Sequence, residues 1–206
     1  SDLCTVTGLQ QVRSEAQESD PIGPVSEETV AAVLPKVSPI VADLIRIQLL
    51  ADMRPGEVCM MRPVYLTMTG DVWTYAPPHH KTSHRGKARL IHIGPKAQAI
   101  VKRYLLNCRI DTYLFSPVES EALRRAAVHA RRKTPMGCGN RPRTNHRSRP
   151  KYRPRNRYDT STYAQTIRYG CAKAWPVPKG LNDDAIKLWR REHRWSPNQL
   201  RKATAT

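Results

Sequence analysis

The sequence predicts a mainly α-helical fold with one small antiparallel three-stranded sheet. Apolar residues recur with helical spacing along most of the 206 residues, and short β-like runs occur only between residues 64 and 93. Hydrophobic residues make up 39% of the chain, which is enough to bury a core. No apolar run approaches the roughly 18 residues that a membrane span requires, so we expect no membrane partner.

The first helices are marked by caps and breakers. Ser26 is placed as the N-cap of a helix that ends at Pro35, and Ser38-Pro39 begins a second helix with one apolar face. Arg54-Pro55-Gly56-Glu57 ends the second helix and opens a further short turn of helix.

The predicted sheet follows. Val64 to Met68 and Val72 to Ala76 form a hairpin, and Ala88 to Ile93 form the third strand after a polar stretch from His79 to Lys87. Helical patterns then dominate. The later helices are expected to begin at Pro95, at the Ser116-Pro117 cap (running toward Arg132), at Thr160 or Ser161 (to about Ala174), at Asp183 (to His193) and at Ser196-Pro197.

Composition divides the chain into three parts. Residues 1–24 are polar and end in Pro and Gly, which is typical of a linker. Residues 25–206 form one domain, interrupted at about 134–158 by a segment rich in Arg, Pro, Asn and Gly. The sequence stops inside a helical pattern without a cap, so we expect residues 25–206 to be an incomplete domain.

The charge balance indicates a polyanionic partner. Lys and Arg number 35 against 17 Asp and Glu, a net charge of +18. A surplus of this size exceeds what solubility requires and favours nucleic acid over an anionic membrane. The residues between 141 and 157 include eight basic and no acidic side chains. They are expected to bind a phosphate backbone: Arg141, Arg143, Arg147, Arg149, Lys151, Arg153, Arg155 and Arg157.

The cysteine and histidine patterns predict neither a disulfide framework nor a metal. The five cysteines lie far apart with no pair at CxxC spacing, and Cys59 and Cys171 fall in apolar stretches as buried thiols. His79, His80 and His84 have no carboxylate or cysteine at ligand spacing. We therefore expect no metal and no cofactor, and a reducing, cytoplasmic location.

Three short motifs in a fixed order carry a resemblance. The first is Ala51 to Val58 around Arg54-Pro55-Gly56-Glu57, the second is His80-Lys81-Thr82 with Gly86 to Gly94, and the third is Pro197 to Thr206 around Arg201. Together they resemble the first arginine box, the lysine hairpin and the second arginine box of tyrosine recombinases of the phage-integrase type. The match covers roughly residues 25–206 apart from the basic segment, and it looks closest to a bacterial branch of that family.

The resemblance implies a catalytic-domain fold and a set of roles. Members cut and rejoin DNA through a 3′-phosphotyrosyl intermediate, and they act as tetramers on two duplexes. Many carry an N-terminal DNA-binding domain, so by this resemblance residues 1–24 would be the linker from such a domain. By this match Arg54 and Arg201 would hold the scissile phosphate, since guanidinium is permanently charged and forms bidentate bonds. Lys81 would protonate the leaving 5′-oxygen, with Lys87 as its rival. Glu57 would orient site residues, or simply carry charge at a helix start.

Two departures from the family pattern qualify the match. Asn198 stands where the family usually has His, and an amide can hydrogen-bond a phosphate but cannot act as a base. Lys202 replaces a residue that is often His and keeps positive charge near the phosphate. All eight tyrosines precede Arg201, so the sequence holds no tyrosine at the family's nucleophile position. Tyr158, Tyr163 and Tyr169 are interpreted as helix-face or DNA-backbone residues.

Two alternatives stay open beside the recombinase. One is a non-catalytic basic protein that binds nucleic acid by neutralising phosphates. The other is a degenerate recombinase relic, which the changes at Asn198 and Lys202 favour. In each case the expected partner is nucleic acid, and for the recombinase it is double-stranded DNA.

Overall fold

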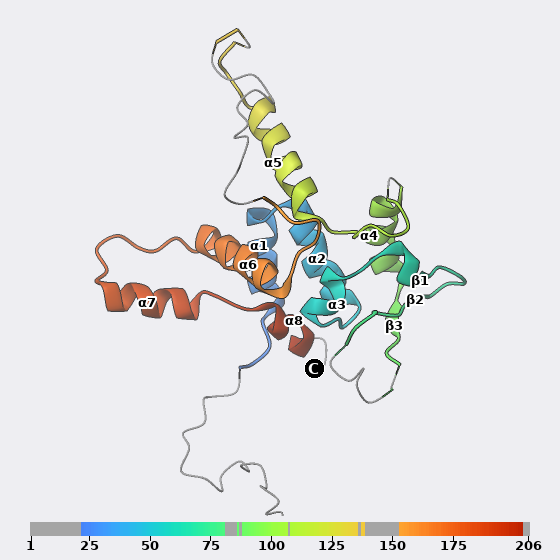
Figure 1. Cartoon of the computed structure of the whole chain (residues 1–206). Coiled ribbons are helices and arrows are strands. Elements are labelled where there is room, and N and C mark those ends of the chain that lie inside the picture. Colours follow the sequence, from blue (N-terminus) through green and yellow to red (C-terminus); the bar gives the residue numbers. More distant parts are fainter. Residues whose placement is uncertain are drawn as a thin grey trace, which may run out of the picture.

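The computed structural model describes residues 22–80, 86, 88–106, 108–135, 137–138 and 153–203. Within these ranges the protein is mainly helical with one three-stranded antiparallel sheet, as the sequence predicts (Figure 1). The first half contains α1 (Glu27–Val33), a 3-10 turn (Leu34–Lys36), α2 (Pro39–Leu50), α3 (Pro55–Cys59) and a second 3-10 turn (Pro63–Tyr65). After the sheet come α4 (Pro95–Leu105), α5 (Pro117–Ala130), α6 (Thr160–Ala174), α7 (Asp183–Glu192) and α8 (Pro197–Ala203).

The predicted caps are present. The Ser26 hydroxyl accepts a hydrogen bond from the Thr29 amide, and the Ser38 hydroxyl accepts one from the Val41 amide. Each serine thus satisfies one of the amides that a helix start leaves without a partner. The local sequence is sufficient to place where α1 and α2 begin.

The sheet is smaller than predicted. Its strands are β1 (Leu66–Thr67), β2 (Trp73–Tyr75) and β3 (Ile91–Ile93), in the order β1-β2-β3. The prediction of a strand from Val64 is wrong because Pro63 opens a 3-10 turn, and the third strand begins at Ile91 rather than Ala88. The middle strand, β2, limits the length of both neighbouring strands, because it offers only three residues for them to pair with.

The core is built around α2. Eight of its residues are buried: Ile40, Val41, Ala42, Asp43, Leu44, Ile45, Ile47 and Gln48. The prediction of a single apolar face is therefore too narrow, because α1, α3, α4, α6 and α8 are arranged around this helix (Figure 1). A helix enclosed in this way must be apolar on most of its surface.

Helix α6 packs very closely against α1 and the turn that follows it. A Cβ atom on Gly170 would lie 2.6 Å from Val37 and 2.8 Å from Val33 side-chain atoms. Only glycine fits at this contact, so a larger residue would push α6 away from α1. The spacing of α6 matters for the site described below, because its first turn forms one wall of that site.

The buried thiols are confirmed, whereas one interpretation of the tyrosines is wrong. Cys59 and Cys171 are buried, and burial raises the pKa of Cys59 to about 12, so it stays protonated. Tyr158 and Tyr163 are buried too, which leaves neither ring available to a DNA backbone. Tyr169, in contrast, is exposed on α6. Among the described residues, no helix is long and apolar enough to cross a membrane.

Candidate active site

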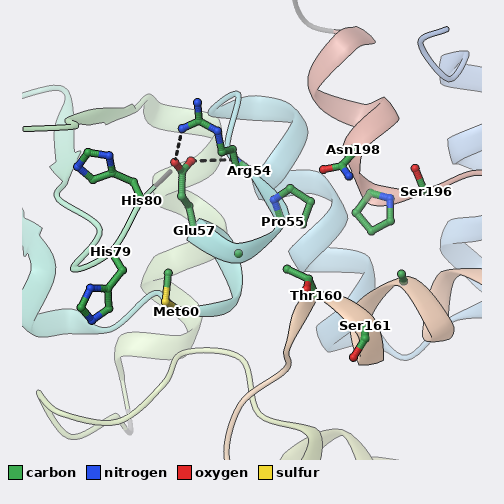
Figure 2. Close-up of a pocket in the computed structure, with 13 residues that line it drawn as sticks. Arg54, Pro55, Glu57, Met60, His79, His80, Thr160, Ser161, Ser196 and Asn198 are labelled. Atoms are coloured by element: carbon green, nitrogen blue, oxygen red, sulfur yellow. Dashed lines mark hydrogen bonds and ion pairs between the residues drawn. The ribbon is translucent and has the colours of Figure 1, made fainter. Parts of the chain in front are cut away.

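One open pocket collects residues from four separate segments. It has a volume of about 610 Å³ and lies between the start of α3, the loop after β2, the first turn of α6 and the start of α8 (Figure 2). Its walls consist of Arg54, Pro55, Gly56, Glu57, Met60, His79, His80, Thr160, Ser161, Ala164, Ser196, Pro197 and Asn198. Three of the predicted site residues, Arg54, Glu57 and Asn198, therefore meet here.

Glu57 fixes Arg54 at the edge of this pocket. Its side chain is almost fully buried, and Oε1 accepts a hydrogen bond from Arg54 Nη1 at 2.9 Å (Figure 2). Oε2 accepts a second one from the Arg54 backbone amide at 2.8 Å, which caps α3. The same carboxylate thus holds the Arg54 side chain and caps the start of α3, while its role in orienting catalytic residues stays a prediction.

Arg89 is a member of this cluster that sequence reasoning missed. Its Nε lies 2.7 Å from Glu57 Oε1, and its Nη2 donates to Glu57 Oε2 at 3.2 Å. Two guanidinium groups therefore compensate one buried carboxylate, as burial of such a charge requires. The signal in the sequence was an arginine inside the lysine-hairpin motif, two residues before the third strand.

The turn after α2 places Arg201. Asp52 has a positive φ of 46°, and the Met53 amide donates to the Gln48 carbonyl, which closes the helix with a Schellman-type turn. The Asp52 carboxylate then lies 3.4 Å from Arg201 Nε on α8. Arg201 is not part of the pocket wall, but its partner stands only two residues before Arg54.

A buried polar relay holds α8 against α2 and α6. The Tyr163 hydroxyl donates to Gln48 Oε1 at 2.9 Å, and Gln48 Nε2 donates to the Pro197 carbonyl at 2.7 Å. These three residues are all buried, so every bond in the relay forms away from water. The relay sets where α8 begins, and with it the positions of Asn198 and Arg201.

Asn198 and the two pocket histidines stand on opposite sides of Figure 2. The exposed Asn198 lies at the start of α8, while His79 and His80 come from the loop after β2 with their rings directed away from α8. In the described part of the chain, no group of three or more His, Cys, Asp or Glu could hold a metal ion. The absence of a metal at these histidines stays a prediction, because His84 lies outside the described residues.

The end of the basic segment is attached to the body near this pocket. Arg153, Arg155 and Arg157 are exposed, and the Arg157 guanidinium lies 5.5 Å from the centroid of the Tyr113 ring. Arg62 stacks on the same ring at 4.0 Å. The chain then passes through Asp159, which caps α6, into Thr160 of the pocket wall.

The remaining predicted residues are only partly placed. Lys81, Lys87, Arg141, Arg143, Arg147, Arg149 and Lys151 lie outside the described residues. Lys202 is exposed on α8, and its ammonium group donates to the Ile22 carbonyl. Its predicted contact with DNA stays a prediction.

None of the described tyrosines lines the pocket. Burial raises the pKa of Tyr75, Tyr158 and Tyr163 above the ordinary value, so these phenols remain neutral and enclosed. The one tyrosine that is not described, Tyr152, lies outside the described residues. No described tyrosine is thus positioned to attack a group bound in the pocket.

Comparisons with protein-family models, curated proteins and solved structures found no match.

The arrangement is suited to holding an anion. Glu57 is the one carboxylate among the described residues that line the pocket, and two arginines compensate its charge. Around it the wall offers the Arg54 guanidinium, the Asn198 amide and the hydroxyls of Thr160, Ser161 and Ser196. Donors of these kinds bind phosphate oxygens, and guanidinium does so in bidentate fashion.

Proposed function

We propose that this chain is the phosphate-activating part of a tyrosine recombinase, which cuts and rejoins double-stranded DNA through a 3′-phosphotyrosyl intermediate. The observation that carries the proposal is the assembly of Arg54, Glu57 and Asn198 on one pocket, with Arg201 anchored at Asp52 beside it. These residues come from two distant motifs. The relay from Tyr163 through Gln48 to Pro197 supports their joint placement.

In the proposed reaction, a tyrosine oxygen gives up its proton to solvent and attacks phosphorus while the bond to the 5′-oxygen breaks. Negative charge grows on the two non-bridging oxygens, and Arg54 and Arg201 would stabilise it. Asn198 would donate a hydrogen bond to the same phosphate but could not take up a proton. The proton for the 5′-oxygen would come from Lys81, or from Lys87 on the same hairpin.

Glu57 would act through the arginines rather than on the substrate. Its carboxylate accepts a hydrogen bond from the Arg54 guanidinium, so that Arg54 is already oriented before a phosphate binds. Preorganisation of this kind is what makes a charged donor effective at a transition state. The carboxylate itself is enclosed by both arginines and is shielded from the DNA.

The partner of the proposed enzyme is duplex DNA, and the net charge of +18 supports this choice. The family resemblance adds a tetramer on two duplexes and a cytoplasmic, bacterial setting to the proposal. The attacking tyrosine is proposed to lie outside the described residues, since none of the described tyrosines lines the pocket.

The arginine roles can be tested without the tyrosine. A duplex selected from a randomised pool for binding would carry a strand whose 3′-phosphate is esterified with p-nitrophenol, and hydroxylamine would serve as an external nucleophile. p-Nitrophenolate leaves without a proton, so the assay needs neither the tyrosine nor Lys81. We expect Arg54→Ala and Arg201→Ala to slow its release by about 10² to 10³ each, while DNA binding is retained.

Arg168→Ala is the matched control, because Arg168 is an exposed arginine on α6 whose guanidinium donates to Gln165. It should leave release unchanged. A protein that binds the duplex but shows the same slow release with and without Arg54 and Arg201 would be a non-catalytic nucleic-acid-binding protein. A degenerate recombinase relic would give the same result, and the Asn198 amide in place of a base favours that second candidate.

A further inference from the structure

Helix α5 stands away from the rest of the molecule. Figure 1 shows it projecting from the body, and none of its residues is buried. Leu123 and Val128 are 50% and 60% exposed, so even its large apolar side chains find little cover among the described residues. At 1.5 Å per residue, its 14 residues make a rod of about 21 Å.

The sequence of α5 explains how a helix persists with little tertiary packing beyond its first turns. Ser116 accepts a hydrogen bond from the Val118 amide, Pro117 follows at the first helical position, and alanine recurs through the helix. The Glu121 carboxylate accepts hydrogen bonds from Arg124 at 2.7 and 2.8 Å and from Arg125 at 2.7 Å. Local capping, propensity and ion pairs replace the burial that holds α2.

The first turn of α5 and the end of the basic segment lie at one place on the body. Ser120 in the first turn of α5 donates to the Ser38 hydroxyl at 2.6 Å. Tyr158, where the basic segment ends, is buried, and its phenol lies near the side chains of the same two serines. The first turn of α5 and the residues that precede α6 therefore both lie at the N-terminal cap of α2.

The sequence from residue 117 to residue 157 carries most of the chain's net positive charge. Residues 117–157 contain 13 Lys and Arg against 2 Asp and Glu, a net charge of +11, and the other residues supply the remaining +7. The two acidic residues lie in the first turns of α5, so the charged residues at the far end of this helix are all basic. There the Arg132 guanidinium donates to the carbonyls of Thr134 and Cys138, while Arg131 and Lys133 are exposed.

We propose that α5 is a stalk that carries a basic tip, residues 131–138, onto duplex DNA away from the pocket. The stalk holds the cations about 21 Å from their root, a distance that corresponds to roughly six base pairs. The inference rests on the proposed function in taking duplex DNA as the partner. Chain continuity supports that choice, because the basic segment runs through Arg157 and Asp159 into the pocket wall.

The chain supplies its own probe for this contact. Cys138 is exposed at the tip, whereas Cys59 and Cys171 are buried. An iron–EDTA chelate attached to Cys138, with Cys4 and Cys108 changed to serine, would cleave any DNA backbone near the tip. We expect strand cleavage of a bound duplex, and its loss when about 1 M salt releases the DNA.

Three variants sharpen the test. Arg131→Ala with Lys133→Ala should suppress tip cleavage, and the salt dependence of binding should flatten by up to about 1.8 in the log–log slope. Deletion of residues 121–127 removes about two helical turns and should move the cleaved positions by about three base pairs on a selected duplex. Arg125→Ala removes the same net charge from a full-length stalk and should leave the cleaved positions in place.

Unchanged cleavage and slope in the tip variant would overturn the proposal. So would cross-linking of Cys138 between two protein copies with no DNA cleavage, since that would make the stalk a protein contact. Arg54→Ala should keep tip cleavage intact. Failure of the stalk and failure of the proposed catalytic site are thereby separable.

Discussion

Helix α2 in the body and helix α5 in the stalk have similar lengths but opposite environments. α2 has eight buried residues and is enclosed by other helices, whereas α5 has none. Their sequences differ accordingly: α2 is rich in Ile, Val and Leu, and α5 is rich in Ala, Arg and Glu. A helix is stabilised either by burying side chains or by local propensity, and this chain uses both means.

The same contrast separates two carboxylates that each bind two arginines. Glu57 is 2% exposed and holds Arg54 and Arg89, while Glu121 is 29% exposed and holds Arg124 and Arg125. The pairs look alike in distance. Burial decides how much each set of ion pairs contributes to the free energy of unfolding, because a charge left unpaired in the interior cannot be solvated.

The largest effect is expected from exchanging these carboxylates for amides. Glu57→Gln should lower the free energy of unfolding by about 3–5 kcal/mol, because two partly buried guanidinium groups would lose their counter-charge. Glu121→Gln should cost about 1 kcal/mol or less. Urea unfolding followed by circular dichroism measures both, and equal losses would contradict the assigned difference in burial.

A second pair of substitutions compares apolar side chains. Ile45→Ala in α2 should lower the free energy of unfolding by about 2–5 kcal/mol, since Ile45 is fully buried and the change leaves a cavity. Leu123→Ala in α5 should change it by no more than about 0.5 kcal/mol. A large loss from Leu123→Ala would show that something covers the stalk in solution.

The smallest effect concerns pH. Hydrogen bonds from Arg124 and then Arg125 lower the pKa of Glu121 to about 2 in the folded chain, against an ordinary value of 4.5. A lowered folded pKa stabilises the fold above the unfolded value, and this contribution disappears as pH falls from about 4.5 to 2. Acid titration by NMR should show the Glu121 carboxyl titrating near pH 2, and Arg124→Ala should move it upward. A Glu121 pKa near 4.5 in the unsubstituted chain would exclude the ion pair.

Much of the local structure was readable from the sequence. Ser26, Ser38 and Ser116 each mark a helix start, because a serine hydroxyl satisfies an amide within three residues of itself. The lengths of the strands were not readable. The apolar patterns continue past Thr67 and before Ile91, but a strand extends only where a neighbour can pair with it.

The sequence named several of the residues that lie at the candidate site, but it did not predict how they contact one another. Arg54, Glu57 and Asn198 meet at the pocket as the motif order implied, and Arg201 is joined to them through Asp52. Arg89 was missed because nothing in one sequence pairs an arginine with a carboxylate 32 residues earlier. The bond of Tyr163 to Gln48 could not be predicted because the two residues lie far apart in the chain.

The sequence by itself determined the helical fold class, the caps, the unequal distribution of charge and the residue types at the site. These properties depend on near neighbours or on composition, so they need no knowledge of the packed chain. The tertiary structure alone decided which arginines share Glu57, which tyrosines are buried, and that α5 stands unsupported while α2 is enclosed. Those outcomes depend on contacts between distant segments, and burial then sets the strength of every charge and hydrogen bond involved.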